Sequence, residues 1–313
     1  MQELILEKFQ VRKSNKEKTK FIDYLKERLS ESGYDKEADI TVEEKGWGIL
    51  KSRNIVVGNP KEAELFITAH YDTCAVIPFP NLMAPTNPIL FLVFQVLIAI
   101  MILVIAGVMA VPFAIITRDA LITYNAFLVS LILIAIQLMI GFRSSHTAND
   151  NTSGVITITR IMEGLSEEQK SKVCAVYFDN EEKGLFGSAY FSKKHKKDVK
   201  GKLLINFDCV GDGNNIVFLA KKKARQDKNY NTLVEVLNDC ATDYDGKCLC
   251  KKMKPMMFPS DQANFSNGIG VCALRKSPVG MYCARIHTPF DTRCREENVE
   301  FLSRAMMEFV EKI

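Results

Sequence analysis

The sequence is poor in histidine, with four among 313 residues, and it has a single tryptophan. It lacks paired Cys-x-x-Cys clusters, and Cys248 and Cys250 stand too close together for an ordinary disulfide framework. Its nine cysteines therefore indicate neither a thiolate zinc site nor a set of disulfides. Residues 1–20 are charged and have no signal-peptide core. These absences favour a reducing compartment, and we expect the chain to face the cytosol.

A strong excess of one charge is also missing, because the formal net charge is only +4. The basic runs at 193–197, 221–225 and 251–254 are short and carry no interleaved aromatic residues, so no nucleic-acid partner is expected. They are typical of solvated faces, with contact to anionic lipid headgroups as the alternative. The chain is 47% hydrophobic and long enough to bury a substantial core, as one large domain or two small ones.

Charge is absent altogether from two long apolar runs, residues 89–116 and 121–142. Pro112 is expected to end or kink the first run, which leaves residues 89–111, about 34 Å of helix. The second run would form about 33 Å of helix at the same rise per residue. Both lengths match a bilayer hydrocarbon core about 30 Å thick, so each run is predicted to span a membrane.

The tight connection at 117–120 predicts an antiparallel hairpin whose two ends emerge on the same side. The chain is thus divided into a discontinuous catalytic body, residues 1–83 and 143–313, and an inserted hairpin, residues 84–142. Residues 89–142 are expected to contact the lipid bilayer. The alternatives are buried core helices or an apolar dimerisation arm, but two uncharged helices of this length exceed what such a domain normally buries.

The leading stretch, residues 1–87, precedes the apolar runs and decides the expected orientation. It has no signal and would otherwise have to cross the membrane, so we expect a two-span membrane protein with a cytoplasmic body. Counting positive charges is weak support, because Arg118 lies in the hairpin loop and Arg143 on the body side.

Outside the hairpin, apolar runs of strand length alternate with segments of helical periodicity. Strands are expected at 63–69, 173–178, 203–207 and 271–275, and helices at 21–29, 152–165, 184–194 and 296–312. Such alternation predicts an α/β fold with a mixed, largely parallel sheet that is flanked by helices.

Several of these apolar runs give way to a polar turn that carries a histidine or a carboxylate. The candidate site residues are His70, Asp72, Asp150, Glu181, Glu182, Asp208 and His287. An open α/β sheet presents its ligands at the carboxyl ends of its strands. Histidine nitrogens and carboxylate oxygens are the usual zinc donors, and two metals need a shared carboxylate. The pattern therefore predicts a two-metal hydrolytic site.

Taken singly, most of these residues have an ordinary interpretation. Asp150 stands at a helix start and suits an N-cap, the adjacent glutamates suit a turn, and His287 suits an exposed loop. Asp208 is harder to explain, because a carboxylate after an apolar run is costly without a metal or hydrogen bonds. The appearance of all of them together, each at the end of an element, is what makes the pattern specific.

Five segments carry a resemblance to a known family. They read ITAHYDT at 67–73, NDNTSGV at 149–155, FDNEEKGLFGSAYF at 178–191, INFDCVGDG at 205–213 and IHTPFDT at 286–292. Over residues 60–83 and 143–313 the chain resembles the M28 family of zinc aminopeptidases and related enzymes. The resemblance implies a zinc-exopeptidase-like fold and two zinc ions per chain.

The resemblance also implies a role for each candidate residue. His70 and Asp208 would bind one zinc and Glu182 and His287 the other, with Asp150 as the bridge. Glu181 would be the general base. Asp72 would orient His70 by accepting the second imidazole proton, a role that its two-residue spacing also favours.

Two departures from the family pattern stand out. Members often carry Ser-Asp-His before the last ligand, whereas this chain has Ser260, Asp261 and Gln262, which puts substrate anchoring by that loop in doubt. The inserted hairpin is the larger departure, because it separates the His-x-Asp segment from the bridging aspartate.

The resulting hypothesis is a membrane-associated di-zinc aminopeptidase that acts on peptides. One alternative is a glutaminyl-cyclase-like enzyme with a single zinc, and another is a membrane scaffold that keeps the fold without catalysis. The complete set of metal-binding positions argues against both.

Overall fold

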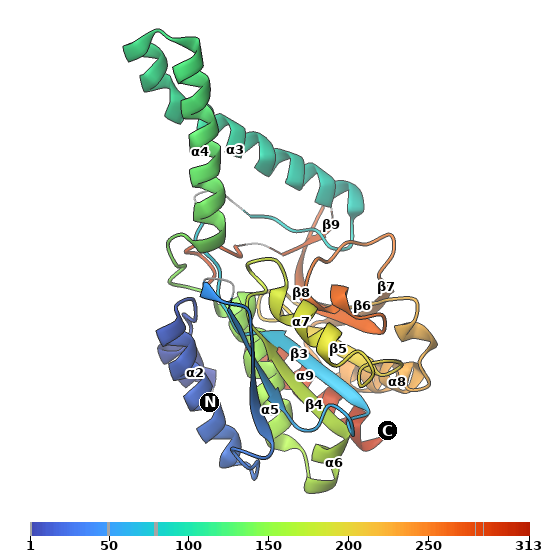
Figure 1. The fold of residues 1–313 in the computed structure, drawn as a ribbon. Coiled ribbons are helices and arrows are strands. Elements are labelled where there is room, and N and C mark those ends of the chain that lie inside the picture. Colours follow the sequence, from blue (N-terminus) through green and yellow to red (C-terminus); the bar gives the residue numbers. More distant parts are fainter. Residues whose placement is uncertain (1, 49–50, 78–80, 279, 284) are drawn as a thin grey trace.

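The computed structural model describes residues 2–48, 51–77, 81–278, 280–283 and 285–313. Its body is built on a nine-stranded sheet with helices on both faces (Figure 1). The strands in spatial order are β1 (Ile40–Lys45), β2 (Ser52–Val57), β4 (Val173–Phe178), β3 (Leu65–His70), β5 (Leu203–Phe207), β8 (Gly268–Ser277), β6 (Asn215–Ala220) and β7 (Lys247–Lys252), with β9 (Gly280–Tyr282) paired to β8.

The helices are α1 (Gln2–Lys8), α2 (Asn15–Ser30), α3 (Pro88–Thr117), α4 (Ala120–Ile140), α5 (Gly154–Gly164), α6 (Glu167–Lys172), α7 (Phe186–Lys194), α8 (Tyr230–Cys240) and α9 (Glu296–Glu311). The central strands β4, β3, β5 and β8 run parallel to their neighbours in that order, and β1, β2 and β6 join this group through antiparallel pairs. The parallel centre brings the carboxyl ends of four strands to one edge of the sheet.

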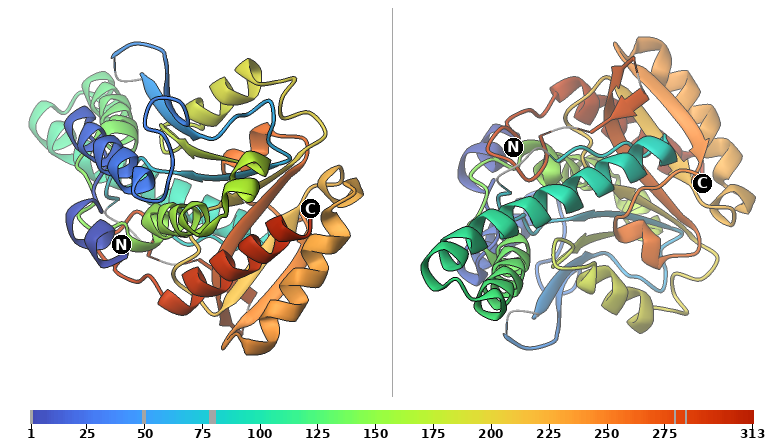
Figure 2. Two further views of the ribbon diagram at one scale, coloured as in Figure 1. Left: turned by 90° about the horizontal axis from the view of Figure 1, so that it is seen from below. Right: turned by 90° about the horizontal axis from the view of Figure 1, so that it is seen from above.

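Alternating side chains of the central strands fill two separate cores. Ile67 of β3 and Ala175 of β4 belong to the large core that α2, α5, α8 and α9 cover. Phe66 and Val176, the immediate neighbours of Ile67 and Ala175 in these strands, belong to a smaller core on the other face with Phe191 of α7. These strands are buried on both faces, which explains why each reads as an unbroken apolar run. Figure 2 shows the helices on the two sides of the sheet.

The expected α/β fold is confirmed, and the strands at 173–178 and 203–207 have their predicted bounds. Several elements were missed, namely β1, β2, β6, β7, α1, α6 and α8. β7 was missed because it is a polar strand, KCLCKK, whose partly exposed side chains lack an apolar alternation. β6 is an apolar run, NIVFLA, with no polar candidate residue after it to draw attention.

The inserted segment forms two helices that stand out from the body beyond the carboxyl edge of the sheet (Figure 1). α3 passes obliquely over the body, as the view from above in Figure 2 shows, and packs against α4. Of the two expectations for Pro112, the end of the helix was wrong, because α3 continues to Thr117, and the kink stays a prediction. Proline removes only one backbone donor, and the turns on either side of it keep their own bonds.

Both helices are long and apolar enough to cross a membrane. They are not the buried core helices that were considered as an alternative. In their most apolar windows only 11% of α3 and 6% of α4 is buried. Ala106, Ala110 and Ser130 are among the few buried hairpin residues, as expected where small side chains let two helices approach each other.

Candidate metal centre

The candidate residues meet at the carboxyl edge of the parallel centre. His70 is the last residue of β3, Asp208 follows β5, and the glutamate pair follows β4 after two residues. Because β4, β3 and β5 are neighbours in the sheet, their ends bring these side chains together. The structure thus gathers all seven residues that the sequence singled out, although their individual roles stay predictions.

A first group of donors consists of His70, Asp150 and Asp208, whose ligand atoms all lie within 4.8 Å of one another. His70 Nε2 is 3.3 Å from Asp150 Oδ1 and 3.6 Å from Asp208 Oδ1. The three residues are 1%, 4% and 5% exposed. Two carboxylates and an imidazole that meet in a buried position form a suitable binding site for a divalent cation.

A second group lies on the more open side of the site. His287 Nε2 is 3.0 Å from Asp150 Oδ2 and 3.2 Å from Glu182 Oε2. Asp150 therefore presents one oxygen to each histidine, which is the arrangement that a bridging carboxylate requires. The Cys74 thiol joins this group, within 4.8 Å of the ligand atoms of Glu182 and His287.

Asp72 contacts the glutamate pair as well as His70. Its carboxylate accepts the backbone N–H groups of Glu181, at 3.0 Å, and of Glu182, at 3.3 Å. His70 Nδ1 is 3.6 Å from the Asp72 carboxylate but 3.1 Å from the Asp72 backbone oxygen. Asp72 thus holds the loop that carries the glutamates, and its backbone is the nearer partner of the imidazole.

Two buried cations from the N-terminal segment bond to the loops that carry the candidate residues, and sequence reasoning missed both. Lys18 of α2 forms an ion pair with Asp179, just before the glutamates, and donates to Asn180 Oδ1 at 3.1 Å. Breaking such a buried pair typically costs about 3–5 kcal/mol. Neither a motif nor a charge pattern in the sequence distinguishes Lys18 from its exposed neighbours.

Arg12 is the second of these cations and is fully buried. Its Nε donates to the backbone oxygen of Tyr71, at 2.5 Å, and its second terminal nitrogen donates to Thr152 Oγ1, at 3.1 Å. One side chain therefore ties the His70 loop to the loop that follows Asp150.

Two further buried carboxylates surround the site. Asp291 accepts the backbone N–H groups of Asn149, at 2.9 Å, and of Asp150, at 3.0 Å, and so fixes the proposed bridge. Its place within the segment IHTPFDT was a signal that could have identified it. Asp261 is fully buried, and neither of its carboxylate oxygens has a hydrogen-bond partner among the described residues.

The electrostatics of the site show an excess of negative charge. Burial raises the pKa of Glu182 to about 8 and that of Asp261 to about 7. Desolvation also raises the pKa of Glu181 well above its usual value; His70 opposes this shift and Glu182 adds to it. Although burial disfavours its charged form, Glu182 and Asp150 raise the pKa of His287 to about 9. Carboxylates thus outnumber the groups that neutralise them.

This donor set fits zinc or a similar divalent cation. The buried oxygens Glu182 Oε1 and Asp208 Oδ1 have no hydrogen-bond partner within the described part of the chain. Leaving such groups unpaired is costly, and a cation would satisfy them. The donors are imidazole nitrogens and carboxylate oxygens, which zinc accepts in sites with catalytic roles.

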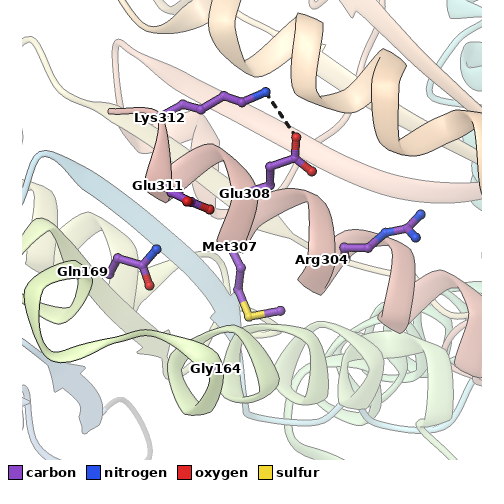
Figure 3. Close-up of a pocket in the computed structure, with 7 residues that line it drawn as sticks. All are labelled: Gly164, Gln169, Arg304, Met307, Glu308, Glu311 and Lys312. Carbon is purple, nitrogen blue, oxygen red and sulfur yellow. Dashed lines mark hydrogen bonds and ion pairs between the residues drawn. The ribbon is translucent and has the colours of Figure 1, made fainter.

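A pocket elsewhere in the body does not compete with this site. It has a volume of about 750 Å³ and lies between the α5–α6 region and the end of α9 (Figure 3). Gly164, at the end of α5 opposite to Asp150, lines it. Its charged residues include Glu308 and Lys312, which pair with each other at 3.1 Å. We assign no chemistry to this pocket.

Comparison with known proteins concerns the family and the fold of the chain. The model of peptidase family M28 matches residues 135–307, more than half of the chain. Curated proteins give no match. Among solved structures, the Legionella pneumophila LapA aminopeptidase superposes with a TM-score of 0.54 at 13% identity, covering 99% of this chain and 69% of that one.

Two other solved structures are similar over nearly their whole length. A glutaminyl cyclase from Bacteroides thetaiotaomicron superposes with a TM-score of 0.59 at 17% identity, covering 97% of this chain and 93% of that one. A Zn-dependent exopeptidase from Parabacteroides distasonis gives 0.55 at 15% identity, with 96% and 92% covered. At these identities the likeness shows a shared fold, on which both hydrolysis and cyclisation occur.

Proposed function

Because this chain belongs to peptidase family M28, we propose that it is a membrane-associated di-zinc aminopeptidase that removes N-terminal residues from peptides. The observation that carries the proposal is the pair of donor groups that share Asp150. His70 and Asp208 would hold one ion, and Glu182 and His287 the other. A site with donors for two ions suits hydrolysis by an activated water.

Zinc, when bound, lowers the pKa of a coordinated water toward neutrality and polarises a substrate carbonyl. Glu181 is suited to accept the proton of the attacking water, because desolvation has raised the pKa of its carboxyl group well above the ordinary value. Glu181 then returns this proton to the nitrogen of the departing amine. Asp72 supports the step by fixing the backbone of Glu181 with a 3.0 Å hydrogen bond.

Glutaminyl cyclisation is the second candidate, since cyclases share this fold. It is less well supported, because one of the two donor groups would be left without an ion in an enzyme with one zinc. The two activities leave different products. A peptidase releases a free amino acid, whereas a cyclase releases ammonia from an N-terminal glutamine and leaves the chain length unchanged.

The hairpin supports attachment to a bilayer. α4 has 21 residues, about 32 Å of helix, which matches a hydrocarbon core about 30 Å thick. Lys13, Arg143 and Lys183 line a cleft of about 610 Å³ together with Ile140 at the foot of α4. Glu17 lines the same cleft and pairs with Arg143. Cations near a membrane surface are attracted to anionic headgroups by about 1 kcal/mol for each charge, and an excess of them beside a span favours the cytoplasmic side.

The foot of the hairpin is also tied to the metal centre. The Val76 N–H donates to the Phe142 oxygen at 2.8 Å, and the Ile77 N–H donates to the His287 oxygen at 2.9 Å. We infer that the substrates are apolar peptides or peptides held at the membrane, because hydrogen bonds connect the foot of the hairpin to the segment that carries His287. The alternative is that the hairpin serves as an anchor only.

Profiling against a peptide library tests the proposal. The full-length protein in detergent is incubated with peptides of varied N-terminal residue, and the products are identified by mass spectrometry. Release of single N-terminal residues, lost in Glu181→Gln and after chelation, is expected. Loss of ammonia from N-terminal glutamine without cleavage would identify a cyclase instead, and no turnover of any peptide would favour a non-catalytic scaffold.

A further inference from the structure

Cys74 lies beside the second donor group, and the roles considered so far do not use it. It is 1% exposed and stands four residues after His70. Its Sγ lies within 4.8 Å of the ligand atoms of Glu182 and His287. Its backbone oxygen accepts the Ser144 N–H at 3.4 Å, which ties it to the segment that follows the hairpin.

The surroundings of Cys74 differ from those of the other cysteines. A buried free cysteine usually behaves as a small hydrophobic side chain. The thiol of Cys240 also donates to Glu308 Oε2 at 3.3 Å, and that of Cys283 accepts the Asn149 amide N–H at 3.5 Å. All of the other eight cysteines nevertheless belong to, or pack against, one of the four apolar clusters: Cys174, Cys209, Cys240, Cys248, Cys250, Cys272, Cys283 and Cys294. In the described part of the chain, Cys74 is a member of none of them. Its thiol lies instead near the polar side chains of Glu182 and His287.

A second observation concerns Glu182, whose side chain is 7% exposed. One of its oxygens, Oε2, is 3.2 Å from His287, whereas the other, Oε1, is buried without a hydrogen-bond partner among the described residues. A cation held between Glu182, His287 and Cys74 would satisfy that oxygen. The unpaired oxygen and the thiol therefore point independently to the same place.

We propose that the Cys74 thiolate is a ligand of the second metal ion, together with Asp150, Glu182 and His287. This inference rests on the proposed function, because it assumes that two ions bind. As the metal–sulfur bond forms, the S–H proton leaves to solvent, and neither sulfur nor metal changes oxidation state. Cys74 adds a soft donor to an otherwise nitrogen and oxygen set.

The fourth donor makes the two metal positions unequal. The first group offers three protein donors, His70, Asp150 and Asp208, and so retains a position for water. The second group would have four donors, which is the number found in closed zinc sites. The carboxylates of Glu181 and Glu182 both lie within 4.8 Å of a His70 ring nitrogen, so Glu181 is close enough to serve the first position. Water activation would therefore take place at the first position, while the second ion holds Asp150 and Glu182 in place.

A thiolate also changes which metal the second position prefers. Soft sulfur ligands favour zinc and cadmium over manganese, which prefers carboxylate and water. We therefore expect the second position to bind manganese poorly in the wild type. Removing the sulfur should lower the affinity for a second zinc on the order of 10²-fold. Loss of a residue that only hydrogen-bonds to a ligand typically lowers metal affinity by about 10- to 100-fold, so loss of a ligand should reach or exceed the upper end of that range.

Cobalt titration of the full-length protein in detergent tests the proposal without using activity. The wild type should show a near-ultraviolet thiolate-to-cobalt charge-transfer band that grows as the position beside Cys74 fills. Cys74→Ala should lose this band and bind the second ion more weakly. Cys174→Ala is the matched control, because that cysteine is equally buried but lies in an apolar cluster away from the site.

X-ray absorption at the zinc edge of the wild-type protein keeps the test decisive if Cys74→Ala fails to fold. A sulfur scatterer near 2.3 Å is expected, at about half a sulfur per zinc when two ions are bound. Two bound zinc ions with only nitrogen and oxygen neighbours would overturn the ligand role of Cys74 and leave the aminopeptidase proposal standing. Failure of the aminopeptidase proposal would appear instead in the peptide products.

Discussion

The body of this chain buries its apolar side chains, whereas the hairpin exposes them. In the body, apolar residues fill two cores, and charged groups such as Lys18 and Asp150 are nonetheless 2% and 4% exposed. In the hairpin, Ile116 is 80% exposed and Leu121 is 68% exposed. The surface of the body is therefore suited to water, and the surface of the hairpin is suited to hydrocarbon.

The comparison also teaches where each region places its charge. The hairpin carries charge only at its tip, at Arg118 and Asp119, and is otherwise uncharged. The body concentrates carboxylates at one edge of its sheet, where burial raises several of their pKa values. A region that holds unpaired buried carboxylates needs a compensating cation, whereas an uncharged helix pair needs only an apolar surrounding.

The strongest way to break this comparison is to remove the shared carboxylate. In Asp150→Ala, both donor groups lose a member, so we expect loss of both metals and of detectable activity. Metal content measured by mass spectrometry of the purified protein checks this result. If the variant retained two ions per chain, Asp150 would not be the bridge.

A smaller effect is expected from Glu181→Gln, which removes the proposed base and leaves the ligands in place. Turnover should fall by a factor on the order of 10² to 10⁴ while both metals stay bound. Glu168→Gln, at an exposed position on α6, is the matched control. Wild-type rates in Glu181→Gln would exclude Glu181 from the mechanism.

Asp72→Asn should have a milder consequence, because Asp72 holds the loop that carries the glutamates and is not itself a proposed ligand. An amide cannot accept both N–H groups of the glutamate loop, so zinc affinity should fall about 10- to 100-fold. Competition with a zinc-binding dye measures the affinity. Damage as severe as that of His70→Ala would indicate that Asp72 binds metal directly.

Metal removal should leave a body whose stability depends on pH. Burial raises the pKa of Glu182 and of Asp291 to about 8 and that of Asp261 to about 7, so the folded state binds more protons than the unfolded state. The raised pKa of His287, about 9, acts in the same direction. The contribution of these bound protons to the free energy of unfolding is fully present below the unfolded carboxyl pKa of about 4. It is lost as pH rises through the folded pKa values of about 7 to 9.

Thermal unfolding of the chelated protein between pH 6 and 9 checks this expectation. The midpoint should fall as pH rises, and it should fall less in the zinc-loaded protein, where the cations compensate the carboxylates. A chelated protein that gains stability over this range would show that the carboxylates are ionised and paired without metal.

The smallest effect on chemistry is expected from replacing residues 84–140 with a short Gly/Ser linker. The body buries its own cores without the hairpin, so turnover of a small polar aminoacyl substrate should stay close to that of the full-length enzyme. Efficiency on apolar peptides should drop, because these substrates gain from the membrane. Equal efficiency on both classes would reduce the hairpin to an anchor.

Much of the site was predictable because strand ends carry a local signal. His70 and Asp208 each close or follow an apolar run, and strands parallel to one another place such residues at one edge. The hairpin was predictable for a similar reason, since length and lack of charge are properties of consecutive residues. The end of α3 was not, because one missing backbone donor did not outweigh the turns around Pro112.

The sequence by itself determined the α/β alternation, the two apolar helices and the residue types of the metal centre, because each of these is written in short stretches of chain. Only the tertiary structure decided which side chains support that centre. Lys18, Arg12 and Cys74 reach it from segments whose local patterns resemble an ordinary helix or loop. Their partners are chosen by packing across the sheet and by the cost of burying charge, and such contacts join residues more than a hundred positions apart in the chain.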